Sequence, residues 1–428
     1  MKCIERGTTK KTFGICMLAA AILFGSAAAK ADVVLDWNTI AVNTAIANGQ
    51  NPFAQARSAA IVQLAVFEAV NTITGEYRPY LGTVTAAPGA SAEAAAVEAA
   101  YRVLTTFFPA TALTLDAQRL TSLALIPNGK AKNDGIATGE AAALAMIALR
   151  ANDGSSPAQV KIPGPPVPGE WQATPSCPVV NGVAVGLFFQ WQNVTPFGIP
   201  SVNAFLLDPP PALTSNKYTK TYNEVMRIGS AASTERPQDR ANVVLFYAAS
   251  SPTLVINQAA NQVAREQGRS LSHNARALAL INMAMSDSLV AAFLNKYHYN
   301  FWRPETAIQH GDVDGNPDTD PDVSFVPFII TPCFPGYPSN HGSAGNAGAE
   351  VLRRLYGEAG HFITLSNPLL PSIVLQYTSF HQITDDISDA RVYGGIHFRT
   401  DQVAGAGLGR AVGTAVYKNN LRPLHHDN

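Results

Sequence analysis

Apolar side chains recur at helical spacing along most of the chain. Residues 54–70, AQARSAAIVQLAVFEAV, repeat apolar positions every three or four residues, as one face of a packed helix does. Alternation typical of strands is scarce, and residues 179–189 are the best candidate for a hairpin or loop. The helical pattern continues in residues 91–108, 114–125, 134–149, 217–228, 237–250, 254–266 and 275–299. The chain is therefore predicted to have an all-α fold.

Two stretches rich in proline and glycine interrupt the helices. Residues 152–178 contain the run PGPPVPGEW, and residues 197–214 contain three consecutive prolines. Proline inside a helix removes a backbone donor and clashes with the preceding turn, so both stretches are predicted to be long extended connections. They divide the chain into an N-terminal helical half, residues 32–215, and a C-terminal helical half, residues 216–428. We expect the halves to pack as two helical bundles in one body.

The first 31 residues have the pattern of a signal peptide. Lys10 and Lys11 close a basic segment, residues 13–24 are apolar, and Ala29-Lys30-Ala31 fits the small-x-small rule for cleavage. No later stretch is expected to reach the ~20 apolar residues that cross a bilayer, so no stable membrane span is predicted. The pattern predicts a periplasmic or secreted protein.

Charge and cysteine content narrow the class of protein further. Residues 1–31 hold five of the 30 basic and one of the 31 acidic side chains, so the remaining chain carries a net charge of −5. A weakly acidic chain without a basic stripe is unsuited to binding nucleic acid. Cys177 and Cys333 are the two cysteines after residue 31. Export would permit a disulfide between them, but the sequence leaves that pairing open.

All nine histidines lie from His273 onward, so imidazole chemistry is expected in the C-terminal half. The first cluster of candidate residues there is the segment KYHYNFWRP, from Lys296 to Pro304. On one continuous helix, Lys296 and Arg303 would fall nearly on one face, about 10 Å apart. Such a pair is more often a solvated surface. The aromatic neighbours indicate burial instead, and two buried cations would need an anion.

The second cluster is FPGYPSNHGS, from Phe334 to Ser343. Ser339 is predicted to cap a helix whose first turn offers free backbone N–H groups, which suit an oxyanion. His341 would then lie at the rim of that site as an acid or base. The simpler alternative is a capped helix start with an incidental histidine.

The third cluster is RVYGGIHFRTD, from Arg391 to Asp401. His397 and Asp401 are four positions apart, so the carboxylate can accept the Nδ1 proton and leave Nε2 free as a ligand or nucleophile. Arg391 can face the same place across the Gly-Gly pair. Taken alone, a His–Asp pair is more often structural.

In order, the three clusters give Lys-x6-Arg-Pro, Pro-Ser-x-His and Arg-x5-His-x3-Asp. This order resembles the signature shared by vanadium-dependent haloperoxidases and type 2 phosphatidic acid phosphatases. The segments NMAMSD (282–287), YNFWRP (299–304) and YGGIHF (393–398) are similar to the bacterial haloperoxidase-related, chloroperoxidase-like branch. Two positions depart from the pattern: Asn340 stands where glycine is usual, and Ala390 where serine is usual.

The resemblance implies an exported enzyme that binds vanadate and uses hydrogen peroxide to oxidise a halide. His397 would be the ligand to vanadium, with Asp401 holding its ring. His341 would take a proton from the peroxide, Lys296 would polarise the peroxide, and Phe334 would belong to the halide pocket. The residues that would bind the oxyanion are Lys296, Arg303, Ser339, Asn340 through its N–H, and Arg391.

The same residues fit a second chemistry, because phosphate can occupy the same site. His397 would then attack phosphorus to form a phosphohistidine, and His341 would protonate the leaving alcohol. An acid phosphatase acting on phosphate monoesters is therefore the first alternative, and a non-catalytic binder of phosphate or vanadate is the second. Phe334 and the length of the chain favour the haloperoxidase. The halide preferred, the organic substrate and assembly into a homo-oligomer stay open.

Overall fold

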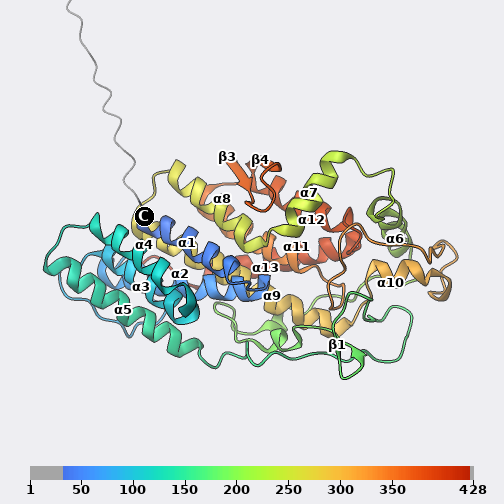
Figure 1. Cartoon of the computed structure of the whole chain (residues 1–428), viewed down its shortest axis with the longest axis horizontal. Coiled ribbons are helices and arrows are strands. Elements are labelled where there is room, and N and C mark those ends of the chain that lie inside the picture. The colour runs from blue at the N-terminus through green and yellow to red at the C-terminus, as the bar shows by residue number, and fades with distance from the viewer. Residues whose placement is uncertain (1–31, 425–428) are drawn as a thin grey trace, which may run out of the picture. The chain divides into compact units, whose positions relative to one another are not determined.

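The computed structural model describes residues 32–424, so the predicted signal peptide, residues 1–31, lies outside the described residues. Within the described part, thirteen α-helices and two small antiparallel hairpins confirm the all-α prediction (Figure 1). The helices are α1 (Val33–Ala47), α2 (Pro52–Thr74), α3 (Ala92–Phe107), α4 (Ala112–Ala124), α5 (Lys130–Arg150), α6 (Asn216–Gly229), α7 (Gln238–Ala249), α8 (Pro252–Glu266), α9 (Leu271–Tyr299), α10 (Pro304–Gln309), α11 (Asn340–Tyr356), α12 (Phe380–Val392) and α13 (Arg399–Asn419). The strands are β1 (Val179–Val180), β2 (Val183–Ala184), β3 (Ala359–Ser366) and β4 (Val374–Ser379).

Helix α9, the longest of the described helices, forms the centre of the fold. It begins after Ser270, whose hydroxyl oxygen accepts the N–H of His273. It ends at Tyr299, and the next residue, Asn300, has the left-handed conformation with a φ of 48°. Most of its side chains are buried because α2, α11 and α13 pack around it. Contrary to the expectation from sequence, α9 is long and apolar enough to cross a membrane, and the bent pair α7–α8 meets the same criterion. The apolar stretch of α9 is 94% buried within the protein.

The N-terminal helices pack directly on this central helix. α2 begins with Asn51 as its cap and Pro52 at its first position, and it contacts α3 and α5 as well as α9. The main hydrophobic core therefore contains residues from both parts of the chain, from Val33 to Leu421. The division of the chain at residue 215 stays a prediction.

Helices α11 and α13 bring the second and third clusters together. They pack so closely that a Cβ atom at Gly405 would lie 2.6 Å from the backbone oxygen of Ser339, and one at Gly413 would lie 2.7 Å from that of Ala347. Glycine permits this approach because it has no side chain. As a result the two helix starts adjoin, and the Ser339 N–H donates to the Asp401 carbonyl at 2.9 Å.

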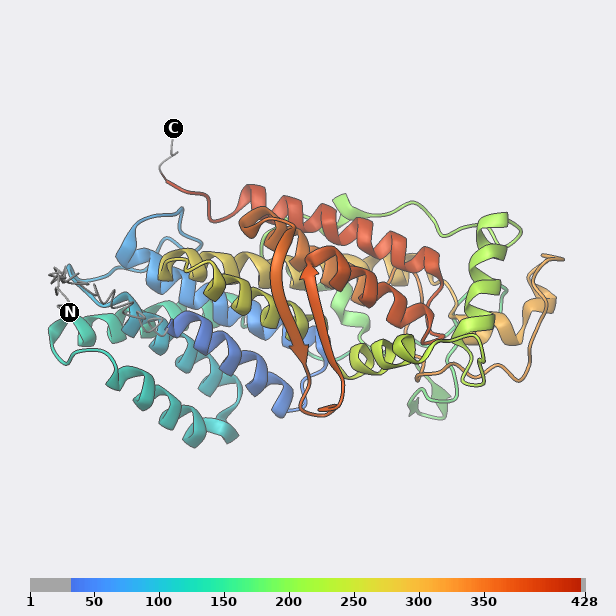
Figure 2. The ribbon, with the colours of Figure 1, turned by 90° about the horizontal axis from the view of Figure 1, so that it is seen from above.

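The hairpin of β3 and β4 was not predicted. Burial alternates along β3, where His361, Ile363 and Leu365 face inward, and Ile363 lies opposite Tyr377 on β4. The hairpin lies over α8 (Figure 2), whose Gln262 amide donates to a β3 carbonyl at 2.9 Å. The period-two pattern of β3 covers only eight residues, and a short apolar pattern of this kind does not by itself distinguish a strand from a helix. The predicted candidate, residues 179–189, does contain the small hairpin of β1 and β2.

The second long connection, residues 197–214, is tied to α9 by buried polar side chains. The Asp287 carboxylate accepts the N–H groups of Phe197, Gly198 and Ile199 at 2.6, 2.7 and 3.0 Å. Asn295 binds the next part of the same connection through one carbonyl and one N–H. These bonds satisfy backbone groups that a connection without a partner strand would leave unpaired.

Cys177 and Cys333 form a disulfide, which answers the question that the sequence left open. Their Cα atoms are 5.4 Å apart, although the residues are 156 positions apart along the chain. The Leu187 N–H donates to the Cys333 carbonyl at 2.7 Å, beside the bridge. The disulfide and this hydrogen bond attach the segment that contains Phe334 to the first proline-rich connection and the residues that follow it.

Replacing both cysteines with serine should lower the free energy of unfolding by about 2–5 kcal/mol, because a bridge across a long loop restricts the unfolded chain. Urea unfolding of C177S/C333S beside the oxidised wild type measures this difference. Reduced wild type should match the double variant. A double variant as stable as the oxidised protein would contradict the role given to the bridge.

Candidate active site

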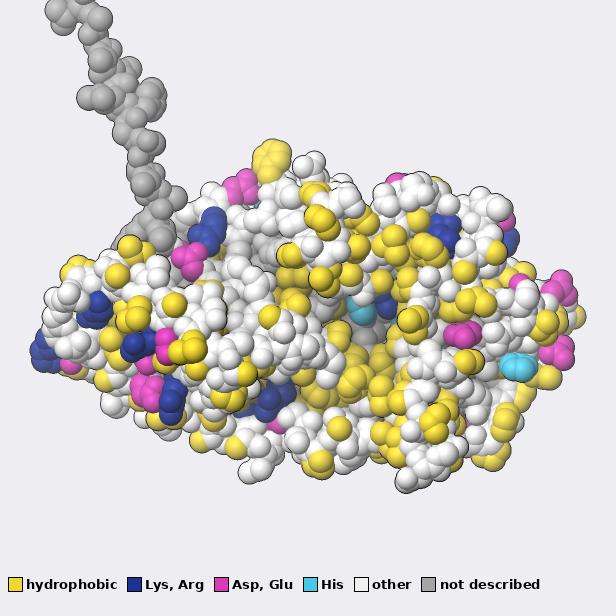
Figure 3. Space-filling model, in the orientation of Figure 1, with side chains coloured by type: hydrophobic (Ala, Val, Ile, Leu, Met, Phe, Trp, Pro, Cys, Tyr) yellow, Lys and Arg dark blue, Asp and Glu magenta, His cyan; other side chains and the backbone are white. Residues whose placement is uncertain are grey.

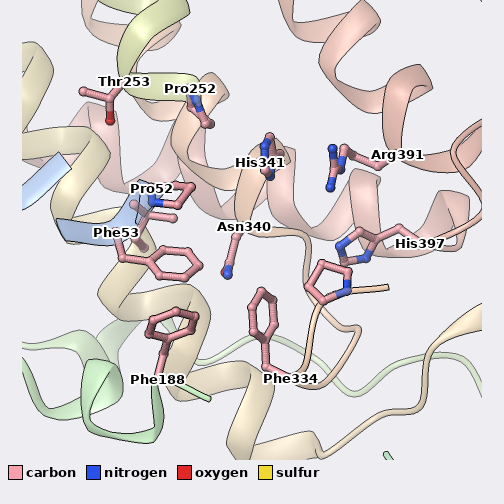
Figure 4. A pocket seen from close by; sticks show the side chains of 12 residues that line it. Pro52, Phe53, Phe188, Pro252, Thr253, Phe334, Asn340, His341, Arg391 and His397 are labelled. Atoms are coloured by element: carbon pink, nitrogen blue, oxygen red, sulfur yellow. The ribbon is translucent and has the colours of Figure 1, made fainter. Parts of the chain in front are cut away.

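The second and third clusters line one cavity of about 180 Å³, and the first cluster adjoins it through the contact of Arg303 with His397. Figure 3 shows the hollow above it, bordered by hydrophobic side chains with a histidine and a basic side chain inside. Five of the predicted site residues line the cavity, namely Phe334, Asn340, His341, Arg391 and His397 (Figure 4). The other four, Lys296, Arg303, Ser339 and Asp401, are fully buried and do not line it.

The first cluster is not one helix, so the predicted helical face of Lys296 and Arg303 is wrong. α9 ends at Tyr299, and Arg303 precedes α10, whose first residue is Pro304. The residue before a proline avoids helical angles, which separates the two helices here. The two side chains nevertheless meet at one loop. Lys296 Nζ donates to the carbonyls of residues 335 and 336 at 2.8 Å each, and Arg303 Nε donates to that of residue 334 at 2.9 Å.

His397 and Asp401 are paired as predicted, across the start of α13. His397 Nδ1 lies 2.9 Å from Asp401 Oδ2, which also accepts the Phe398 N–H at 3.1 Å. This bond places the ring proton on Nδ1 and makes Nε2 the acceptor. The sequence predicted a free Nε2, and this prediction is wrong. Nε2 accepts a hydrogen bond from Arg303 Nη1 at 2.8 Å, so a ligand at Nε2 would have to displace that contact.

The second cluster forms the start of α11. Ser339 caps the helix, since its Oγ accepts the Gly342 N–H at 3.1 Å, while its own hydroxyl proton can still be donated. His341 is partly exposed at the cavity. Its pKa is lowered well below the usual value by burial and by Arg391, Lys296 and Arg303, in that order. His341 is therefore neutral near pH 7, as a base must be.

Three buried cations meet at this site without a carboxylate partner. In residues 32–424, no ion pair joins Lys296, Arg303 or Arg391 to an acid, and Asp401 is bound to His397. Burial lowers the pKa of all three cations. Arg303 Nη2 and Arg391 Nε also lack a hydrogen-bond partner in the described part of the chain. Buried charge of one sign costs several kcal/mol unless an opposite charge is near, so the site is built for an anion.

Comparison with known proteins finds a family match over the part of the chain that holds the three clusters. Residues 276–426 match the family of the VCPO second helical-bundle domain. The vanadium chloroperoxidase of Curvularia inaequalis is 28% identical over 185 residues, which cover 36% of this chain and 30% of that protein. The match thus spans less than a third of that relative.

Two solved structures share the fold over nearly its whole length. A bacterial vanadium-dependent iodoperoxidase superposes with a TM-score of 0.75 at 23% identity, covering 92% of this chain and 98% of its own. An apo-form bacterial vanadium-dependent chloroperoxidase superposes with a TM-score of 0.70 at 17% identity, covering 86% and 94%. In these comparisons the chain is therefore similar to the vanadium-dependent haloperoxidase and type 2 phosphatidic acid phosphatase superfamily.

The residues present fit a tetrahedral oxyanion. Lys296 uses two of its three N–H donors on carbonyls, so one remains for a ligand. The unpartnered nitrogens of Arg303 and Arg391 and the Ser339 hydroxyl supply further donors. An oxyanion would thus satisfy both the unpaired charge and the unpaired donors at once.

Beyond the superfamily signature, the structure adds an apolar wall to the cavity. Phe334 packs on Phe293, with ring centroids 5.4 Å apart, and lies against both Lys296 and Arg303, at 5.3 and 5.0 Å from its centroid. The lining residues that the sequence did not indicate are the apolar Pro52, Phe53, Phe188, Pro252, Leu289 and Pro332, together with Thr253. They come from segments far apart in the sequence, and none carries a local signal of chemistry.

Proposed function

We propose that this chain is an exported vanadium-dependent haloperoxidase that uses hydrogen peroxide to oxidise a halide. The observation that carries the proposal is that three buried cations, none paired to an acid within residues 32–424, lie with the His397–Asp401 pair beside one cavity. The resemblance of residues 276–426 to the VCPO domain supports the haloperoxidase over other oxyanion chemistry. The buried disulfide supports a periplasmic or secreted location, since such bridges persist in oxidising compartments.

In this proposal each residue of the site has a distinct role. Bound vanadate would supply a Lewis acid that activates hydrogen peroxide toward halide. His397 would hold that group through Nε2, with Asp401 fixing the ring. Arg303, Arg391 and Lys296 would neutralise its oxygens. His341, neutral because of its lowered pKa, would take the first proton from the peroxide.

A phosphatase is the second candidate, because the unpaired cations would neutralise phosphate equally well. His397 Nε2 would then be the nucleophile, once Arg303 Nη1 gives up its hydrogen bond to that atom. His341 would donate a proton to the leaving alcohol, once the bound phosphate raises its pKa and it is protonated. The two candidates need the same charges and differ in the co-substrate.

The deciding assay uses purified protein stripped of phosphate, with iodide or bromide and hydrogen peroxide, with and without orthovanadate. Formation of triiodide or tribromide needs no organic acceptor and is followed by absorbance. Vanadate-dependent oxidation that phosphate inhibits supports the proposal. Hydrolysis of p-nitrophenyl phosphate without halide oxidation would replace it with the phosphatase, and binding without either reaction would leave a non-catalytic binder.

Phosphate binding should raise the pKa of the His341 imidazole. The sign follows from the charges: burial and three cations lower this pKa, and a bound dianion would cancel the effect of the cations. An NMR titration of the histidine ring protons with and without phosphate measures the shift, and H341Q assigns the signal. An identical pKa in both titrations would contradict the proximity of His341 to the bound anion.

A further inference from the structure

The side chain of Asn340 is a buried polar group that the proposed oxyanion chemistry does not use. The residue is 4% exposed, and neither Oδ1 nor Nδ2 has a hydrogen-bond partner within residues 32–424. Figure 4 shows its amide end pointing toward the space bordered by Phe53, Phe188 and Phe334. A carboxamide offers both an acceptor and donors, so the ligand group that satisfies both atoms must itself donate and accept, as a hydroxyl does.

The wall opposite this amide is aromatic. The rings of Phe53 and Phe188 pack at a centroid distance of 4.9 Å, and those of Phe188 and Phe334 at 6.2 Å, all edge to face. Phe188 holds its ring there from a backbone with a φ of 64°, which bulky residues rarely adopt. A flat apolar ligand lying on this wall would gain edge and face contacts with several rings.

The size of the cavity limits that ligand to about one ring. Its volume is about 180 Å³. An apolar cavity of about 150 Å³ holds benzene, whereas drug-sized ligands occupy sites of about 300–1,000 Å³. A single substituted ring therefore fits beside His341 and His397.

We propose that this part of the cavity is a phenol subsite, in which the ring lies on Phe53, Phe188 and Phe334 and the hydroxyl binds the Asn340 carboxamide. The inference rests on the proposed function, because the phenol would be the organic acceptor. Peroxide and halide give hypohalous acid. A ring carbon then bonds to the halogen as the halogen–oxygen bond breaks, and the ring proton joins the departing hydroxide to form water. The bound ring would be halogenated at a position that the site selects.

Binding of 4-fluorophenol and fluorobenzene, followed by ¹⁹F NMR without vanadate or peroxide, tests the subsite directly. Wild type should bind the phenol about tenfold or more tightly than fluorobenzene. N340L should bind the two ligands equally, with the affinity for fluorobenzene kept. Its melting temperature should not fall, because the substitution removes a buried unsatisfied amide. F188L should weaken both ligands, while F246L, in a buried phenylalanine that does not line the cavity, should weaken neither.

An unchanged preference for the phenol in N340L would overturn the role of Asn340. Failure of wild type to bind either ligand at about 10 mM would overturn the subsite as a whole. The two proposals fail separately, because triiodide formation involves no aromatic ligand. Phenol binding without halide oxidation would keep the subsite and remove the haloperoxidase. With active enzyme, the ortho-to-para ratio of brominated phenol should differ from that given by reagent hypobromous acid, and N340L should restore the reagent ratio.

Discussion

Replacing His397 with alanine is expected to abolish vanadate-dependent turnover, by a factor of at least about 10³, as loss of a group that acts directly on the reacting centre does. The imidazole is oriented by Asp401 at 2.9 Å, and its Nε2 faces the Arg303 guanidinium. No other described histidine is placed to substitute, because His341 belongs to another helix and has no carboxylate partner. Steady-state rates and ⁵¹V NMR of bound vanadate measure the loss.

Two further variants control for this result. D401N keeps an acceptor for the ring proton but removes the charge, so oxyanion affinity or activity should fall about 10- to 100-fold, less than in H397A. H381A removes an exposed histidine that is also paired, at 3.2 Å from Asp385, and should change neither activity nor fold. Circular dichroism of all three should match wild type. Full activity in H397A would show that the site is wrongly assigned.

The sequence predicted those parts of the site that local chemistry determines. The Ser339 cap and the His397–Asp401 pair each lie within a few residues of chain, so spacing alone indicated the hydrogen bonds that form. The helices were predicted for the same reason, since the apolar period of α2 or α9 is a local property. The order of the three clusters indicated the resemblance to this superfamily without any tertiary contact being known.

Features set by tertiary packing could not be predicted in this way. Lys296 and Arg303 meet because the carbonyls of residues 334–336 hold them, rather than because they share a helix. The contact of Arg303 with His397 joins segments 94 positions apart. Likewise Phe53 and Phe188 reach the cavity from the N-terminal half, where nothing in their surroundings indicates a site. Such contacts depend on how the helices pack, and the spacing of residues along a single sequence does not reveal that packing.

Replacing Arg391 with methionine should make the phosphate-free protein more stable while it removes oxyanion binding. Arg391 is 5% exposed, its Nε has no partner within residues 32–424, and its bond to the Tyr247 carbonyl is long, at 3.4 Å. Burial lowers its pKa to about 10, as expected for a charge without a counter-ion. An apolar side chain of similar length should raise the free energy of unfolding by about 1–3 kcal/mol. The loss of a buried charge contact should weaken phosphate binding about 30-fold or more.

A second buried arginine provides a matched control, because its replacement with methionine should change the stability in the opposite direction. Arg150 is 3% exposed but is paired with Asp153 at 3.0 Å and donates to two carbonyls, so R150M should destabilise the protein and leave phosphate binding unchanged. Calorimetric unfolding and phosphate titration of both variants, with R391K to keep the charge, separate the two roles. If R391M were destabilised like R150M and bound phosphate normally, Arg391 would be a structural residue. If R391M were more stable and bound phosphate weakly, Arg391 would be a binding residue that lowers the stability of the anion-free protein. Such a loss of stability in return for function is common at binding sites.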